Sequence, residues 1–199
     1  MLQLLRPILT TDLHWQAPAE PLLSELPITL KPHLLDTGSL TARVRELSGG
    51  EASVSLLRHD YAKPTGEEAQ RLSIAASDDV LLRDIHLFGG PVTSLPWIFA
   101  HTVIPKGTLS GEGERLGQLG NKPLGEALFA DPEIRRGSLE LTKLLLGNDL
   151  FATAITGLAE APKFLWGRRS QFYLSNGGSL LVAEFFLPAH PAVRGVLAE

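Results

Sequence analysis

Two ionisable side chains stand alone on strand faces that are otherwise apolar. Glu184 lies at the centre of residues 179–188, a short apolar run bounded by glycine and proline that is typical of a buried strand. Arg83 lies in a second such run, 79–87, which ends at a Gly-Gly-Pro turn. Side chains alternate between the two faces of a strand. The apolar residues that share these faces are Leu180, Val182 and Phe186 beside Glu184, and Leu81, Ile85 and Leu87 beside Arg83.

An isolated charge on an apolar face is costly unless another group compensates it. One interpretation is structural: Glu184 belongs to a structural ion pair, such as a buried salt bridge with Arg83, or it remains in contact with water. The other is functional: both side chains line one cavity. A guanidinium presents several donors in one plane and suits a carboxylate. In the functional interpretation, Arg83 holds a ligand carboxylate and Glu184 faces the other end of that ligand.

Two weaker candidates come from a histidine and a helix start. His101 lies in a predicted strand over 95–103, where a lone histidine is more often structural than catalytic. Residues 34–47 predict a turn that leads into a helix, with Thr37 and Ser39 as candidate N-caps. Free N–H groups at a helix start can bind an anion, although most helix starts do not.

The pattern of elements predicts an α+β fold with a single antiparallel sheet of roughly six strands and helices packed on one side. The segments predicted as strands are 52–62, 79–87, 95–103, 133–146, 165–174 and 179–187. Asn176-Gly177 is a strong hairpin signal between the last two. A polar turn is expected over 63–68, and helices over 108–119 and 123–129.

Length and composition predict one domain over residues 1–199. The hydrophobic fraction of 44% is sufficient for a packed core. Residues 1–30 contain four prolines and are expected to form a loosely structured arm. Residues 146–163 are expected to form an inserted loop or short helix.

Charge and residue usage exclude several classes of function. The net charge of −4 argues against binding to nucleic acid or to anionic membranes. The absence of cysteine excludes disulfides, thiolate metal sites and cysteine nucleophiles. No Walker loop, dinucleotide fingerprint or paired-histidine motif occurs, so we expect no metal and no cofactor. There is no apolar run of transmembrane length and no secretory signal, which predicts no stable membrane insertion and a cytoplasmic location.

Several stretches, taken together and in order, resemble the chorismate lyase family. The two most specific are Trp-Gly-Arg-Arg-Ser at 166–170 and Glu-Phe-Phe-Leu-Pro-Ala at 184–189. The other matching stretches are Leu-Arg-Asp-Ile at 82–85, Thr-Val-Ile-Pro at 102–105, Thr-Leu-Ser-Gly at 108–111 and Pro-Leu-Gly at 123–125. The resemblance extends over residues 34–191, and the chain is longer than the family pattern between 144 and 164.

The resemblance implies an antiparallel sheet with an enclosed ligand cavity. It also implies an enzyme that needs no cofactor and converts chorismate to 4-hydroxybenzoate and pyruvate, the first committed step of bacterial ubiquinone synthesis. The partners would then be the substrate chorismate and the product 4-hydroxybenzoate. We expect a monomer.

The resemblance also implies roles for individual residues. Arg83 would hold the aromatic carboxylate, and Glu184 would approach the 4-hydroxyl. Backbone groups at Leu124 and Leu40 would line the pocket, with Leu40 at a position where the family has methionine. We also expect one of two adjacent residues, Arg168 and Arg169, to contact the enolpyruvyl carboxylate, since alternation lets only one of them face inward.

Three alternatives stay open at the level of the sequence. Glu184 could be a general base or only a hydrogen-bond partner. The chain could be a non-catalytic module for aromatic acids, because effector domains of some bacterial regulators share this fold and fold does not determine function. It could also act on a different enolpyruvyl or aromatic acid.

Overall fold

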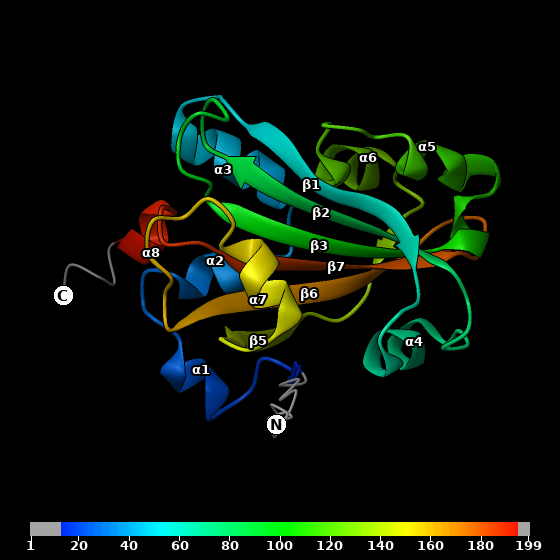
Figure 1. Cartoon of the computed structure of the whole chain (residues 1–199), viewed down its shortest axis with the longest axis horizontal. Coiled ribbons are helices and arrows are strands. Elements are labelled where there is room, and N and C mark those ends of the chain that lie inside the picture. The colour runs from blue at the N-terminus through cyan, green and yellow to red at the C-terminus, as the bar shows by residue number, and fades with distance from the viewer. Residues whose placement is uncertain (1–12, 195–199) are drawn as a thin grey trace, which may run out of the picture.

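The computed structural model describes residues 13–194 and is built on one antiparallel sheet (Figure 1). Its strands are β1 (Ser53–Ala62), β2 (Val80–Phe88), β3 (Ile98–Pro105), β4 (Arg135–Arg136), β5 (Glu140–Leu145), β6 (Phe164–Tyr173) and β7 (Ser179–Phe186). The strand order is β1-β2-β3-β7-β6-β4, and β5 also pairs with β6. The predicted α+β class and single antiparallel sheet are confirmed.

The sheet has seven strands rather than about six because the predicted strand over 133–146 is interrupted. Continuing the register of β4, which pairs Arg136 with Phe172, would place residue 139 opposite Arg169, but Glu140 takes that position. Gly137 lies at the interruption, where its N–H donates to the carbonyl of Gln171 at 2.7 Å. The extra residue separates β4 from β5 and shifts the register by one.

Helices α1 to α3 precede the first strand, α4 to α7 are interspersed with the strands, and α8 follows the last strand. The α-helices are α1 (Leu22–Glu25), α2 (Lys31–Leu35), α3 (Leu40–Ser48), α4 (Gly66–Leu72), α5 (Glu114–Gly117), α6 (Leu124–Ala130), α7 (Asp149–Ala154) and α8 (Pro191–Arg194). Two 3₁₀-helices, η1 (Lys106–Leu109) and η2 (Gly111–Gly113), lie between β3 and α5. None of the helices within residues 13–194 has the length and apolar character needed to cross a membrane.

Most of the helices pack against one face of the sheet, as predicted. On that face the sheet residues Ile98, Trp166 and Phe186 cluster with Leu34 of α2 and Val44 of α3. A neighbouring cluster joins the sheet to α5 and α6. The short helices α4 and α7 pack on the other face, against separate clusters. The central strands β2, β3, β7 and β6 are therefore largely buried on both faces.

Local sequence explains where the helices begin. Ser39, one of the two predicted caps, is the N-cap of α3, and its side chain accepts a hydrogen bond from the Ala42 N–H. The predicted polar turn over 63–68 was an incomplete description, because Thr65 and Glu68 form a capping box that starts α4. The single helix predicted over 108–119 is wrong. A Cβ at Gly113 would lie 1.8 Å from the Thr108 carbonyl oxygen, and this close turn breaks the segment into η1, η2 and α5.

Two segments left loosely defined by the sequence contribute to the core. Within the predicted arm, residues 13–30 include α1 and bury Leu22, Leu26 and Leu30 in the cluster beneath α2 and α3. Residues 1–12 lie outside the described part of the chain. The stretch 146–163 contains α7, whose Phe151 packs with Phe99 and Phe185.

Gly167, within the Trp-Gly-Arg-Arg-Ser motif, is required by close packing across the sheet. It pairs with Phe185 of β7, and a Cβ at Gly167 would lie 2.4 Å from the Phe185 ring. Because the phenyl ring is fully buried, we expect Gly167→Ala to lower the free energy of unfolding by about 1–3 kcal/mol, as measured by urea denaturation.

Gly107→Ala is the matched control, because a Cβ at Gly107 meets nothing within 4 Å. Its effect should stay within about 0.5 kcal/mol. Equal unfolding free energies for the two variants would contradict this account of the motif glycine.

Candidate functional site

A small cavity lies between the sheet and the first turns of α3 and α6, with a volume of about 40 Å³. Its floor is formed by residues from the three central strands, namely Arg83 and Ile85 of β2, Ala100 and Thr102 of β3, and Val182 and Glu184 of β7. Its roof is formed by Leu40, Thr41, Leu124, Gly125, Leu128 and Phe129. The structure therefore brings Arg83, Glu184, Leu40 and Leu124 together around one space.

Arg83 is a buried cation without a carboxylate partner in the described part of the chain. It is 1% exposed, and its Nη2 donates to the carbonyl oxygens of Gly120 at 3.0 Å and Lys122 at 2.8 Å. Its Nε is buried and has no hydrogen-bond partner. Burial lowers the pKa of Arg83 to about 10. The two carbonyls fix the guanidinium, but they are neutral and do not compensate its charge.

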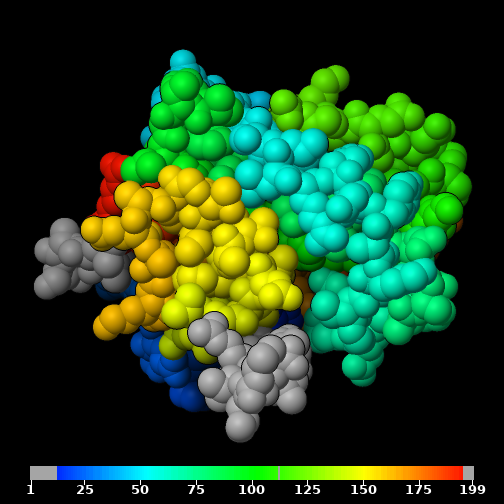
Figure 2. All heavy atoms as spheres, viewed as in Figure 1, coloured from blue at the N-terminus to red at the C-terminus, as the bar shows by residue number. Residues whose placement is uncertain are grey.

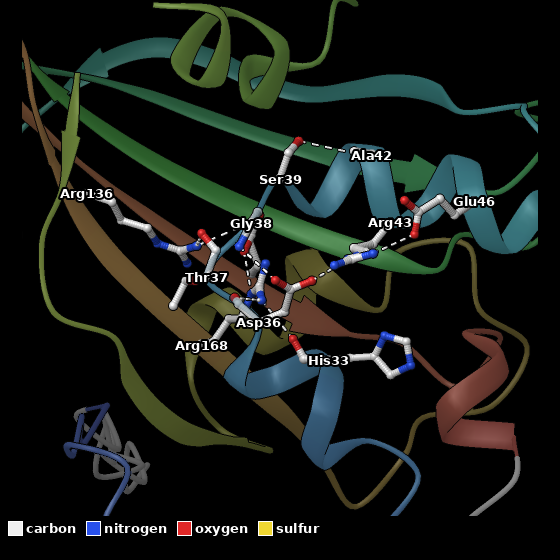
Figure 3. Close-up of polar contacts among 11 residues, drawn as sticks. His33, Asp36, Thr37, Gly38, Ser39, Ala42, Arg43, Glu46, Arg136 and Arg168 are labelled. Carbon is white, nitrogen blue, oxygen red and sulfur yellow. Dashed lines mark hydrogen bonds and ion pairs between the residues drawn. The ribbon is translucent and has the colours of Figure 1, made fainter. Parts of the chain in front are cut away.

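Glu184 pairs with Arg168 rather than with Arg83. Arg168 Nε lies 2.8 Å from Glu184 Oε2, and the Glu184 side chain is 17% exposed. Arg168 Nη1 donates to the carbonyl oxygens of His33 at 2.7 Å and Asp36 at 2.6 Å (Figure 3). No Arg83–Glu184 salt bridge forms within residues 13–194, so Arg83 is not the partner in the structural ion pair of Glu184, which is formed with Arg168.

The sheet separates the two adjacent arginines of the motif. Arg168 lies opposite Glu184 across β6 and β7, on the face of the cavity. Arg169 lies on the other face, where it pairs with Glu67 and Glu140 and stacks over Trp15. Arg169 is therefore not among the residues that surround Glu184.

The beginnings of α3 and α6 meet closely above the cavity. A Cβ at Gly125 would lie 3.0 Å from Thr41 Oγ1 and 3.2 Å from Ser39 Oγ. This contact explains the glycine of the Pro-Leu-Gly motif. It also brings the backbone of Leu124 next to that of α3 at the roof.

One residue near the site was not found from the sequence. Arg136 Nε donates to Ser170 Oγ at 2.9 Å, and Nη1 donates to the carbonyl oxygen of Thr37 at 2.6 Å. Figure 3 shows Arg136 directed toward the Thr37–Gly38 segment, on the opposite side of it from Asp36. The sequence alone does not show which of the adjacent residues Arg135 and Arg136 faces the site. The pairing of β4 with β6 decides this.

His101 lies on the other face of the sheet and belongs to a buried ion cluster. Its Nδ1 is 2.5 Å from Asp84 Oδ1, and its Nε2 is 3.1 Å from Glu68 Oε1. The cluster borders a hollow of about 630 Å³ between α4 and α7, visible between the teal and yellow atoms in Figure 2. Within residues 13–194, no group of three histidine or acidic side chains could hold a metal ion.

Comparison with known proteins shows to which family the chain belongs. A family model described as chorismate lyase matches residues 9–193. The chain belongs to the chorismate lyase family. A probable chorismate pyruvate-lyase from Azoarcus sp. (strain BH72) is 40% identical over 164 residues, covering 80% of this chain and 84% of that protein. One from Coxiella burnetii (strain RSA 493) is 35% identical over 171 residues, covering 83% and 89%.

Among solved structures, the chain is similar to the effector domain of PhnF from Mycobacterium smegmatis, with a TM-score of 0.54 and 16% sequence identity. The match covers 76% of this chain and 90% of that domain. At this identity the similarity shows the fold alone. It agrees with an α+β architecture around one antiparallel sheet.

The His101 cluster makes the free energy of unfolding depend on pH above neutrality. Burial alone would lower the pKa of His101, but the hydrogen bonds and charges of Asp84 and Glu68 outweigh it and raise the pKa to about 9. A histidine with a raised folded-state pKa stabilises the protein fully below its ordinary pKa of 6.5, and this contribution is lost as pH rises through about 9. We expect the free energy of unfolding to fall between these pH values, as measured by urea denaturation at a series of pH values.

His101→Gln should flatten this alkaline slope, whatever its effect on absolute stability. His59→Gln, at an exposed position on β1, should leave the slope unchanged. An unaltered slope in His101→Gln would contradict the assignment of the imidazolium to this cluster.

Proposed function

We propose that the protein is a chorismate pyruvate-lyase that eliminates pyruvate from chorismate and leaves 4-hydroxybenzoate. The observation that carries the proposal is the buried guanidinium of Arg83, which faces a cavity and has no carboxylate partner among the described residues. Family membership supplies the substrate class, and the chemistry of the cavity agrees with it. Relatives at 35–40% identity are named probable chorismate pyruvate-lyases.

The floor of the cavity has the polarity that 4-hydroxybenzoate requires. Arg83 on β2 and Glu184 on β7 are separated by β3, so their strand axes lie roughly 10 Å apart. An aromatic ring fits between the two side chains, with its carboxylate at Arg83 and its hydroxyl at Glu184. Apolar side chains of the floor, such as Ile85 and Val182, would lie on the side of the ring that faces the sheet. We propose these roles for Arg83 and Glu184.

The reaction needs positioning more than strong acid or base chemistry. The bond between ring carbon 3 and the ether oxygen breaks, and the hydrogen on carbon 4 leaves as a proton. The new double bond completes the aromatic ring, and the released enolpyruvate becomes pyruvate after it takes up a proton. Aromatisation drives these steps, so the site contributes by holding the substrate and compensating its charge.

Arg168 acts as a positioning residue for Glu184 in this proposal. Its ion pair with Glu184 fixes the position of the carboxylate, whose oxygens can accept hydrogen bonds. Glu184 then either accepts a hydrogen bond from the 4-hydroxyl or takes the proton from carbon 4. Because Arg168 also binds the carbonyls of His33 and Asp36, it ties Glu184 to the segment that leads into α3.

The cavity is smaller than the proposed ligand. A volume of about 40 Å³ holds only a few water molecules. We propose that a ligand enters when α3 and α6 move apart at the Gly125 contact. We further propose that the enzyme acts in the cytoplasm as a monomer and that its product serves ubiquinone synthesis, as the family resemblance implies.

The decisive experiment incubates purified protein with chorismate without added cofactor and follows 4-hydroxybenzoate and pyruvate separately. We expect both products in equal amounts. We expect Arg83→Gln and Glu184→Gln each to lower kcat/KM by at least about 30-fold, because each removes a charged contact within a buried site.

Arg58→Gln is the control, since this arginine lies on neighbouring β1 and borders the hollow on the other face of the sheet. Its kcat/KM should equal that of the wild type. Binding of 4-hydroxybenzoate without turnover of chorismate would instead identify a non-catalytic module. Equal activity of the Arg83 variant and the control would contradict the proposed role of Arg83 in binding the ring carboxylate.

A further inference from the structure

Arg136 is a second arginine near the cavity that has no carboxylate within ion-pair distance in the described part of the chain. Its guanidinium donates hydrogen bonds to neutral acceptors, namely Ser170 Oγ at 2.9 Å and the carbonyl oxygens of Thr37 at 2.6 Å and Gly38 at 3.4 Å. The guanidinium lies over the ring of Phe172, 5.5 Å from its centroid. A half-buried cation held only by neutral groups is free to exchange them for an anion.

The position of Arg136 is next to the Glu184 end of the cavity. Ser170, which Arg136 contacts, pairs with Val182 of the cavity floor, and the neighbouring pair on the same face is Arg168 with Glu184. Same-face residues on a strand lie about 7 Å apart. Burial lowers the pKa of Arg136 and the negative charge of Glu184 opposes this shift, so the two groups interact electrostatically.

The roof connects Arg136 to the cavity from above as well. Phe172 contacts Phe129 edge to face, and Phe129 lines the cavity. The Thr37–Gly38 carbonyls that Arg136 binds precede Ser39 and Leu40, where the roof begins. Opening of the roof to admit a ligand would therefore loosen the groups that now occupy the Arg136 guanidinium.

The other arginines expected to bind a second carboxylate are already engaged. Arg168 donates to Glu184 through Nε and to the carbonyls of His33 and Asp36 through Nη1. Arg169 is paired with Glu67 and Glu140 on the opposite face. Arg83 and Arg136, in contrast, form no ion pair among residues 13–194.

We propose that Arg136 binds the enolpyruvyl carboxylate of the substrate. The inference rests on the proposed function and deepens it. Chorismate is a dianion, and its ether oxygen is attached to the ring carbon next to the one that carries the hydroxyl. With the ring carboxylate at Arg83 and the hydroxyl at Glu184, the second carboxylate extends from the Glu184 end, on the side where Arg136 lies.

This assignment makes Arg136 a residue that distinguishes substrate from product. The product 4-hydroxybenzoate has only the ring carboxylate, so Arg136 contributes to chorismate binding and not to product binding. Once pyruvate has left, Arg136 returns to the carbonyls of Thr37 and Gly38. Arg83, in contrast, binds both molecules.

The test compares Arg136→Gln and Arg136→Lys with wild type, measuring KM and kcat for chorismate and the Kd for 4-hydroxybenzoate. We expect kcat/KM of Arg136→Gln to fall at least about 30-fold, mainly through KM. The Kd for 4-hydroxybenzoate should change less than about threefold. Arg136→Lys should recover part of the loss, because it keeps the charge without the planar donors.

Arg135→Gln is the matched control, because it makes the same change at the neighbouring exposed position. It should behave as wild type. Equal weakening of chorismate and 4-hydroxybenzoate by Arg136→Gln would overturn the proposal and assign Arg136 to holding the roof. Unchanged kinetics would also overturn it. If the wild type forms no product, the proposed function fails together with this inference, whereas turnover that is insensitive to Arg136 contradicts this inference alone.

Discussion

The buried positive charge of Arg83 is the constraint on which the rest of the site depends. A guanidinium on an apolar face, held by two carbonyls and lacking an ion-pair partner among the described residues, is stabilised only partly by the protein. In the proposed function, a ligand carboxylate completes this compensation. On that proposal, the electrostatic cost carried by the fold becomes binding energy and specificity for an acid.

Strand alternation and strand pairing place each arginine near the site on a particular face of the sheet, with its own contacts. Arg83 and Arg168 lie on the cavity face, and Arg169 lies on the other. Arg168 holds Glu184 in place and anchors the segment that leads into α3. Arg169 joins α4 to the sheet through Glu67. One short sequence motif thus supports both the proposed site and the packing of the opposite face.

Much of the fold and part of the site could be predicted from the sequence, because both follow from alternation within single strands. The cavity faces of β2 and β7 were predicted by the lone charges Arg83 and Glu184. The partner of Glu184 was not, since it depends on the register between β6 and β7. Arg136 was missed because the shift at Gly137, between β4 and β5, determines its position. Such pairings join distant parts of the chain and leave no local pattern.

The most direct test of the central claim removes the ligand carboxylate and the guanidinium separately and together. Binding of 4-hydroxybenzoate and of its neutral amide, 4-hydroxybenzamide, would be measured by calorimetry to wild type and to Arg83→Gln. If Arg83 compensates the carboxylate, wild type prefers the acid by at least about 30-fold, and this preference disappears in the variant. A preference for the acid of the same size in both proteins would contradict the account.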